Sequence, residues 1–296
     1  MLYKDVEKRK AYMEKYIDLH THTTQSDGDY TPETLIEMAI KEQIGVLAIT
    51  DHNTLLPNYD ELQKRYVKDI VLVSGSEISA THLFTTGKQI EIHIVGLFLE
   101  GEDIKGFLST NRSDGKQRAI AILERLKKDC GIDLGHIEKI QSRFPNGQIS
   151  RTGIAKLLVE RGVAESVKEA FDIFVGDYGE KRAFVQNKHK YAGISEVIAA
   201  VRNAEGVAVL AHPLSYGLNE AEMNELLQVF VRAKGQGMEV FYGSYTEEER
   251  SLLLSLAMKY DLVPSCGSDF HRFDNASLCH HFSYEFYEKL RSRRTR

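Results

Sequence analysis

Histidines and carboxylates recur along the chain in short motifs, most of them directly after an apolar run. In chain order the motifs are Asp18-Leu19-His20-Thr21-His22, Asp27, Thr50-Asp51-His52, Glu77, His93, Ala211-His212-Pro213 and Ser268-Asp269-Phe270-His271. Imidazole binds zinc, iron or manganese, whereas carboxylates can bridge two ions. A mixed set without cysteine is therefore typical of a catalytic site that holds several metal ions. A structural zinc site would instead favour thiolates.

Two pairs of these residues are spaced so that each pair can bind one ion. His20 and His22 are two residues apart, as are Asp269 and His271. Residues i and i+2 of an extended strand project to the same side, so both members of a pair can reach one metal. The sequence alone thus predicts chelation at two points of the chain.

The order of the motifs resembles that of the PHP (polymerase and histidinol phosphatase) superfamily of metal-dependent phosphoesterases, and the resemblance extends from Asp18 to His271. It implies a distorted (β/α)7 barrel and a set of metal ligands, which are His20, His22, Asp27, His52, Glu77, His93, His212, Asp269 and His271. By the same resemblance, one ion belongs to His20 and His22, a second to His93 and His212, and a third to Asp27, His52 and His271.

The resemblance also implies the chemistry. We expect about two to three divalent ions, Mn²⁺ in the first place with Fe²⁺ or Zn²⁺ as alternatives. Glu77 and Asp269 are expected to bridge ions and, with His271, to form the catalytic set. A water held between the ions would lose a proton near neutral pH and attack the phosphate ester as hydroxide.

Short apolar runs bounded by turn residues predict seven strands, at residues 16–19, 45–50, 70–74, 90–98, 206–211, 237–242 and 262–266. Helical patterns at residues 32–43, 195–203, 219–234 and 246–260 alternate with them. This alternation predicts a parallel sheet, and seven strands suit a closed barrel. Every strand except the one around Glu239 places a predicted ligand at or just past its end, on the rim where barrel enzymes build their sites.

Residues 106–190 interrupt the alternation. Helices are predicted there at residues 114–129, 152–160 and 165–174, and the segment carries 16 Lys+Arg against 11 Asp+Glu. We therefore expect a barrel domain made of residues 1–105 and 191–296 and an inserted basic helical lid that leaves the fourth strand just after His93. The charge excess would help to attract a polyanion, although a solvated helical surface has the same composition.

Two arginines of the insertion are candidates for binding substrate phosphate. Arg118 and Arg151 match basic positions in the branch of the superfamily that hydrolyses nucleoside 3',5'-bisphosphates and short oligonucleotides. Arginine suits this role because its guanidinium forms bidentate hydrogen bonds with phosphate. Gly153 stands where that branch usually has His, and Arg272 where Gly is common, so the particular substrate stays open.

Composition excludes several classes of protein. With 42% hydrophobic and 27% charged residues the chain is typical of a soluble globular protein. Three cysteines without a C-x-x-C spacing favour a reducing compartment. No apolar run approaches the ~18 residues of a membrane span, and residues 1–16 are too charged for a secretory signal, so a cytoplasmic location is expected.

Three functions fit these observations. The first is a phosphoesterase acting on a small phosphorylated substrate, namely a nucleotide of the bisphosphate or short-oligonucleotide type. For this function we expect neither stable binding of duplex nucleic acid nor binding to a membrane. The second is a phosphatase of histidinol phosphate or another small metabolite, which would share the metals but generally lacks such a lid. The third is a non-catalytic metal-binding module, against which the intact ligand set argues. The oligomeric state stays open.

Overall fold

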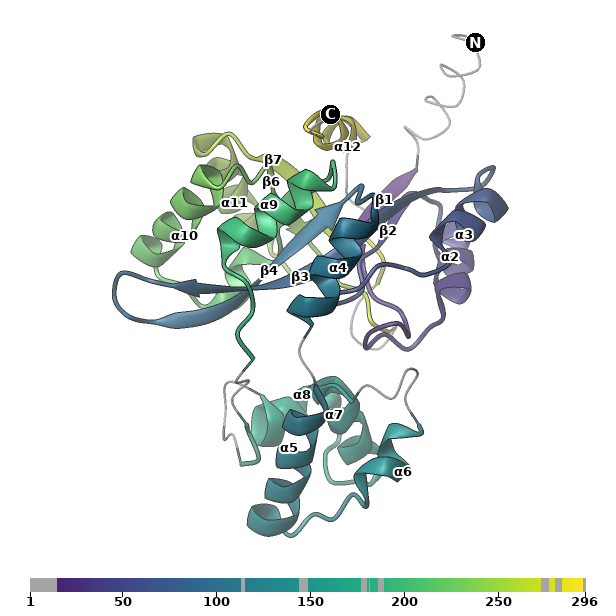
Figure 1. Cartoon of the computed structure of the whole chain (residues 1–296), viewed down its shortest axis with the longest axis vertical. Coiled ribbons are helices and arrows are strands. Elements are labelled where there is room, and N and C mark those ends of the chain that lie inside the picture. The colour runs from purple at the N-terminus through teal and green to yellow at the C-terminus, as the bar shows by residue number, and fades with distance from the viewer. Residues whose placement is uncertain are drawn as a thin grey trace. The chain divides into compact units, whose positions relative to one another are not determined.

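The computed structural model describes residues 15–112, 115–143, 149–176, 180, 182–185, 189–272, 277–279 and 284–294. The charged start of the chain up to residue 14, the predicted first residue of a helix at Asp114, and His280 and His281 lie outside them. The chain divides into two compact units (Figure 1). The barrel unit comprises Met1–Arg112 and Tyr191–Arg296, and the inserted unit comprises Ser113–Lys190.

The barrel unit is built on one seven-stranded sheet in which the strands follow chain order from β1 to β7. The strands are β1 Tyr16–Thr21, β2 Ile44–Ile49, β3 Val71–Leu83, β4 Gln89–Leu97, β5 Val207–Leu210, β6 Gly237–Tyr242 and β7 Val263–Gly267. The sheet nearly closes, because the residues after β7 pair with β1. His22 N donates to Phe270 O and Asp269 N to His20 O, both at 2.9 Å. All seven predicted strands and the barrel are thus confirmed.

One strand departs from the predicted parallel sheet. β4 runs antiparallel to both β3 and β5, while the other neighbouring pairs are parallel. The reason is the short connection, because residues 84–88 can turn a hairpin but cannot cross over to a parallel strand. The prediction of an all-parallel sheet is therefore wrong for β4. As a consequence, His93 reaches the rim from the middle of its strand rather than from the end.

Helices pack around the sheet in the barrel unit. They are α2 Pro32–Lys41, α3 Tyr59–Tyr66, α4 Glu102–Asn111, α9 Ile194–Asn203, α10 Glu220–Arg232, α11 Glu247–Lys259 and α12 Tyr284–Ser292. The predicted start of α2 is confirmed, since the Thr31 hydroxyl accepts from Thr34 N. Helix α11 begins with a capping box, in which Thr246 and Glu249 each bond to the other's backbone. Such caps fix where each helix begins after a rim loop.

The core has apolar layers on both faces of the sheet. Branched strand residues such as Val46, Val95 and Val209 are fully or almost fully buried and pack with Leu290 of α12. On the outer face, α9 and α10 bury Val197 and Phe230 against β3 to β6. The polar motifs lie at one rim of the barrel. Among the described residues, no helix combines the length and apolar character that crossing a membrane requires.

The inserted unit is helical, with α5 Gly115–Cys130, α6 Ile137–Gln141, α7 Arg151–Glu160, α8 Val167–Ala170 and a π-helical turn, η2, at Phe171–Val175. Leu126, Ile154, Leu158 and Phe174 share an apolar core of its own. Gly131, at φ 72°, follows α5 in the left-handed conformation that commonly ends a helix. The predicted third helix is present as α8 and its π-helical continuation.

The chain reaches the inserted unit by an unexpected path. After His93, β4 continues to Leu97, and α4 then follows before the barrel unit ends at Arg112. The insertion therefore does not leave the fourth strand just after His93, because the antiparallel strand first carries the chain to the other end of the barrel. Helix α4 was not predicted, since Gly106 and few apolar residues weaken its pattern.

Candidate metal centre

The structure brings all nine predicted ligands together at one rim of the barrel unit. Their nitrogen and oxygen atoms form three overlapping groups, in each of which the atoms lie within 4.8 Å of one another. The groups are His20, His22, Glu77 and Asp269; His52, Glu77 and His93; and His22, Asp27, His52 and His271. His212 adjoins these groups, because its Nε2 lies 3.0 Å from Glu77 Oε1.

The first group has the spacing of a metal shell. His22 Nε2 lies 3.1 Å from both His20 Nε2 and Asp269 Oδ1, and 3.3 Å from Glu77 Oε2. Bonds of about 2.0 to 2.2 Å to one ion would place neighbouring ligand atoms roughly 3 to 3.5 Å apart. These residues therefore fit a divalent ion without rearrangement of the strands that carry them.

Glu77 lies between two sets of histidines. Its Oε2 faces His20 and His22, whereas its Oε1 lies 2.7 Å from His93 Nδ1 and 3.0 Å from His212 Nε2. Glu77 Oε2 and His93 Nδ1 are buried and have no hydrogen-bond partner of good geometry. Buried polar atoms rarely stay in that state, so both atoms fit a further ligand such as a cation.

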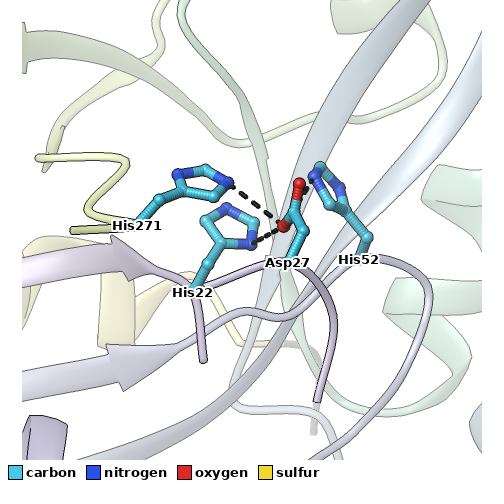
Figure 2. A group of neighbouring side chains, drawn as sticks. All are labelled: His22, Asp27, His52 and His271. Atoms are coloured by element: carbon cyan, nitrogen blue, oxygen red, sulfur yellow. Dashed lines mark ion pairs between the residues drawn. The ribbon is translucent and has the colours of Figure 1, made fainter. Parts of the chain in front are cut away.

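Asp27 is the centre of the third group (Figure 2). Its Oδ1 lies 3.2 Å from His271 Nε2, 3.7 Å from His52 Nε2 and 3.9 Å from His22 Nδ1. His52 also connects this group to the others, because its Nδ1 lies 2.9 Å from Glu77 Oε2. Two of the predicted sets, His20 with His22 and Asp27 with His52 and His271, thus each fall within one group, whereas His93 is grouped with His52 and Glu77 rather than with His212.

The electrostatics of the cluster favour ionised carboxylates. Burial alone would raise the pKa of Glu77, but the nearby imidazoles of His93, His52 and His20 hold this pKa well below its usual range. Burial alone would lower the pKa of His93, yet Glu77 raises it to about 10. Metal binding requires neutral imidazole, so protons on these rings compete with cations for the same positions.

Glu239 supports the ligands from β6, the one strand from which no contribution was predicted. Its side chain is buried, and Oε1 lies 2.8 Å from His20 Nδ1 while Oε2 accepts from His212 N at 2.6 Å. It therefore fixes the ring of one predicted ligand and the backbone of another. The signal that could have revealed it is the alternation Met238-Glu239-Val240, because a carboxylate between buried apolar neighbours needs a partner.

Asp18 and Asp51 also support the cluster rather than join it. Asp18 accepts from Ser268 Oγ at 2.5 Å and from Cys279 N at 2.9 Å. Asp51 accepts from Thr23 N at 2.8 Å and from Ser26 Oγ at 2.6 Å. These bonds tie together the segments that carry His20, His22 and Asp269, so the two aspartates hold these predicted ligands in place.

The backbone is strained at two of the predicted ligands. His212 and Asp269 have φ angles of 25° and 53°, which side chains other than glycine rarely adopt. At Gly267 a Cβ atom would lie 2.3 Å from both Glu239 Oε1 and His20 Cβ. Glycine at this position therefore permits the close approach of the backbone to these two side chains.

Removal of the Glu239 carboxylate should weaken metal binding. We expect Glu239→Ala to lower metal affinity about 10- to 100-fold, since it frees the His20 ring and the strained backbone at His212. Equilibrium dialysis with Mn²⁺ would measure the loss, with the exposed Glu248→Ala as control. Wild-type affinity in Glu239→Ala would assign the residue to packing alone.

One side of the cluster is accessible to solvent. The side chains of His20 and Glu77 are 0% and 1% exposed, whereas those of His52 and Asp269 are 31% and 21% exposed. A molecule that approaches from solution can therefore contact His52 and Asp269. Tyr242, at the end of β6, stands at the same side and donates from its hydroxyl to Asp269 Oδ2 at 2.9 Å.

The two predicted phosphate-binding arginines belong to the inserted unit. Arg118 Nε donates to Val185 O at 2.9 Å, and its guanidinium lies 5.9 Å from the Phe184 ring centroid. Arg151 is the first residue of α7, with its guanidinium 5.8 Å from the ring centroid of Phe171. These contacts lie within the unit, and a role in phosphate binding stays a prediction for both.

A nearly closed seven-stranded barrel with a His/Asp/Glu cluster at one rim is the architecture of a metal-dependent phosphoesterase. The chain belongs to the PHP domain family, which it matches over residues 18–289.

Similar proteins cover nearly the same length. The chain is 35% identical over 260 residues to the 5'-3' exoribonuclease Rnm of Escherichia coli (strain K12), which covers 86% of this chain and 85% of that protein. It is 29% identical over 258 residues to a 3',5'-nucleoside bisphosphate phosphatase of Chromobacterium violaceum, which covers 86% of this chain and 87% of that protein. The solved structure of an amidohydrolase from Chromobacterium violaceum with bound sulfate has a TM-score of 0.80 and 27% identity and covers 95% of this chain and 98% of that one.

Proposed function

We propose that this chain hydrolyses phosphate esters of nucleotides and short oligoribonucleotides in a reaction that depends on divalent ions held by the rim cluster. The observation that carries the proposal is Glu77, whose two carboxylate oxygens face two different sets of histidines. One carboxylate between two cation positions is the arrangement that a polynuclear hydrolase requires.

The nine rim residues are the proposed ligands, with Glu77, Asp269 and His271 closest to the reaction. When bound, divalent ions would activate a water and neutralise the charge that develops on the phosphoryl group. His20 and His22 form the fully buried part of the site, and Glu239 orients the His20 ring. Asp269 and His271 stand at the open side, where they can orient a phosphate ester for attack. About two to three ions, with Mn²⁺ as the first candidate, suit this donor set.

Two considerations support a nucleotide substrate. The relatives from Escherichia coli and Chromobacterium violaceum are named for action on RNA and on nucleoside bisphosphates. In addition, the inserted unit has an excess of basic residues, of which Arg118 and Arg151 are the proposed contacts to substrate phosphate. We propose that this unit acts as a lid that supplies them.

A substrate screen tests this function. Protein reconstituted with Mn²⁺ would be offered a 5'-phosphorylated oligoribonucleotide, a nucleoside 3',5'-bisphosphate, a mononucleotide and histidinol phosphate, with released phosphate and shortened RNA as readouts. We expect turnover of the first two substrates and its loss on chelation. A preference for histidinol phosphate would contradict the proposed substrate class, and activity that survives complete chelation would contradict the metal.

A further inference from the structure

Three polar side chains are buried behind the rim cluster in the barrel unit. Asn53, Ser79 and Asn111 are only 6%, 3% and 5% exposed. Buried amides are costly unless they are hydrogen-bonded, and each of these residues is bonded to another of the three. They form what we call the asparagine clamp, which has no part in the chemistry derived above.

Asn111 is the centre of the clamp. Its Nδ2 donates to Asn53 Oδ1 at 3.0 Å and to the Ser79 carbonyl at 2.8 Å. Its Oδ1 accepts from the backbone N–H of Ala192 at 2.8 Å. One side chain thus connects three segments that are far apart in sequence.

The clamp holds together the two points of the barrel unit at which the insertion is attached. Asn111 is the last residue of α4, one residue before the first segment of this unit ends at Arg112. Ala192 is the second residue of the segment with which the chain re-enters the barrel unit at Tyr191. Its carbonyl accepts from Thr81 N at 2.9 Å. Helices α4 and α9, which flank these two points, pack against each other (Figure 1).

The clamp also borders the metal cluster. Asn53 directly follows His52, adopts a left-handed φ of 48°, and donates its N–H to the Glu77 carbonyl at 2.9 Å. Its amide exchanges two further bonds with Ser79, which is the strand partner of His93. Asn53 would therefore keep most of its bonds without Asn111, whereas the Ala192 N–H would lose its acceptor.

We propose that Asn111 is a positioning residue that fixes the two attachment points of the inserted unit for binding of oligonucleotide substrates. The proposal rests on the proposed function, because it assumes that the inserted unit contacts the substrate. A loosened attachment would affect a substrate that needs contacts to this unit far more than one that needs only the metal cluster.

The test compares two substrates in three variants. Asn111→Ala removes the clamp, Asn111→Ser keeps a hydroxyl that can form one of its hydrogen bonds, and Asn224→Ala is the control. Asn224 suits this purpose because it also makes several side-chain hydrogen bonds in the barrel unit, at α10. Each Mn²⁺-reconstituted protein is assayed with p-nitrophenyl phosphate and with a 5'-phosphorylated oligoribonucleotide, and its metal content and thermal unfolding are measured.

We expect Asn111→Ala to raise KM for the oligoribonucleotide at least about tenfold, a change typical of lost substrate positioning. Its metal content and its kcat/KM for p-nitrophenyl phosphate should stay within about twofold of wild type. Asn111→Ser should recover part of the KM, and it provides the comparison if the alanine variant does not fold.

Two results would overturn the inference. Equal losses with both substrates would show that Asn111 acts on the metal cluster or on stability alone, and a KM like that of Asn224→Ala would show that the clamp positions nothing. A failure of the proposed function looks different, because wild-type protein would then cleave p-nitrophenyl phosphate but not the oligoribonucleotide.

Discussion

Glu77→Gln is expected to lower turnover at least about a hundredfold while the barrel stays folded. Glutamine keeps the shape of the side chain but loses the charge that balances the cations, and its amide nitrogen cannot act as a ligand. Because both carboxylate oxygens face histidine sets, the substitution affects two proposed ion positions at once. Turnover and bound Mn²⁺ should therefore fall together, which phosphate release and elemental analysis would measure.

The matched control is Glu225→Gln, since that carboxylate is also hydrogen-bonded, to Thr85, but lies away from the rim. Its turnover should equal that of wild type. Asp269→Asn should resemble Glu77→Gln, because Asp269 Oδ1 lies 3.1 Å from His22 Nε2. Near-normal rates with full metal occupancy in both rim variants would show that these carboxylates are only structural.

Arg151→Ala is expected to reduce kcat/KM for nucleotide substrates by about 2 to 4 kcal/mol, the range for loss of one partner of a desolvated charge pair. The ions should stay bound, because the proposed ligands all lie in the barrel unit. Arg151→Lys should recover only part of the loss, since an ammonium group keeps the charge but lacks the planar pair of donors. Steady-state kinetics with the best substrate of the screen would measure both variants.

Arg143→Ala provides the control for Arg151, because Arg143 lies in the same unit and forms an exposed ion pair with Glu160 at 2.6 Å. Exposed pairs contribute little, so this variant should behave like wild type. If Arg151→Ala matched it on every substrate, Arg151 would be a surface residue, and specificity would have to depend on Arg118, Arg272 or Tyr242.

The positions of the strands and the rim motifs could be predicted because they depend on local patterns. An apolar run followed by His or Asp indicates a strand that ends at the rim, and a cap such as Thr31 indicates where the next helix begins. Helices α3 and α12 escaped prediction, since few of their residues are buried and tertiary contacts decide their structure.

Other features depend on contacts that sequence spacing does not reveal. The direction of β4 follows from the hairpin at residues 84–88, not from the strand's own composition. The hydrogen-bond partners of Asp18 are not visible in the spacing either, because Ser268 and Cys279 lie 250 and 261 residues away. Glu239 and Asn111 gain their roles from partners between 27 and 219 residues away.

The central claim is that several divalent ions act together at the rim cluster, and a metal titration tests it most directly. Metal-free protein would be loaded stepwise with Mn²⁺, and bound metal per chain and phosphate release would be measured on the same samples. We expect little activity up to one ion per chain and full activity at about two to three. Full activity at one ion or fewer would contradict the account.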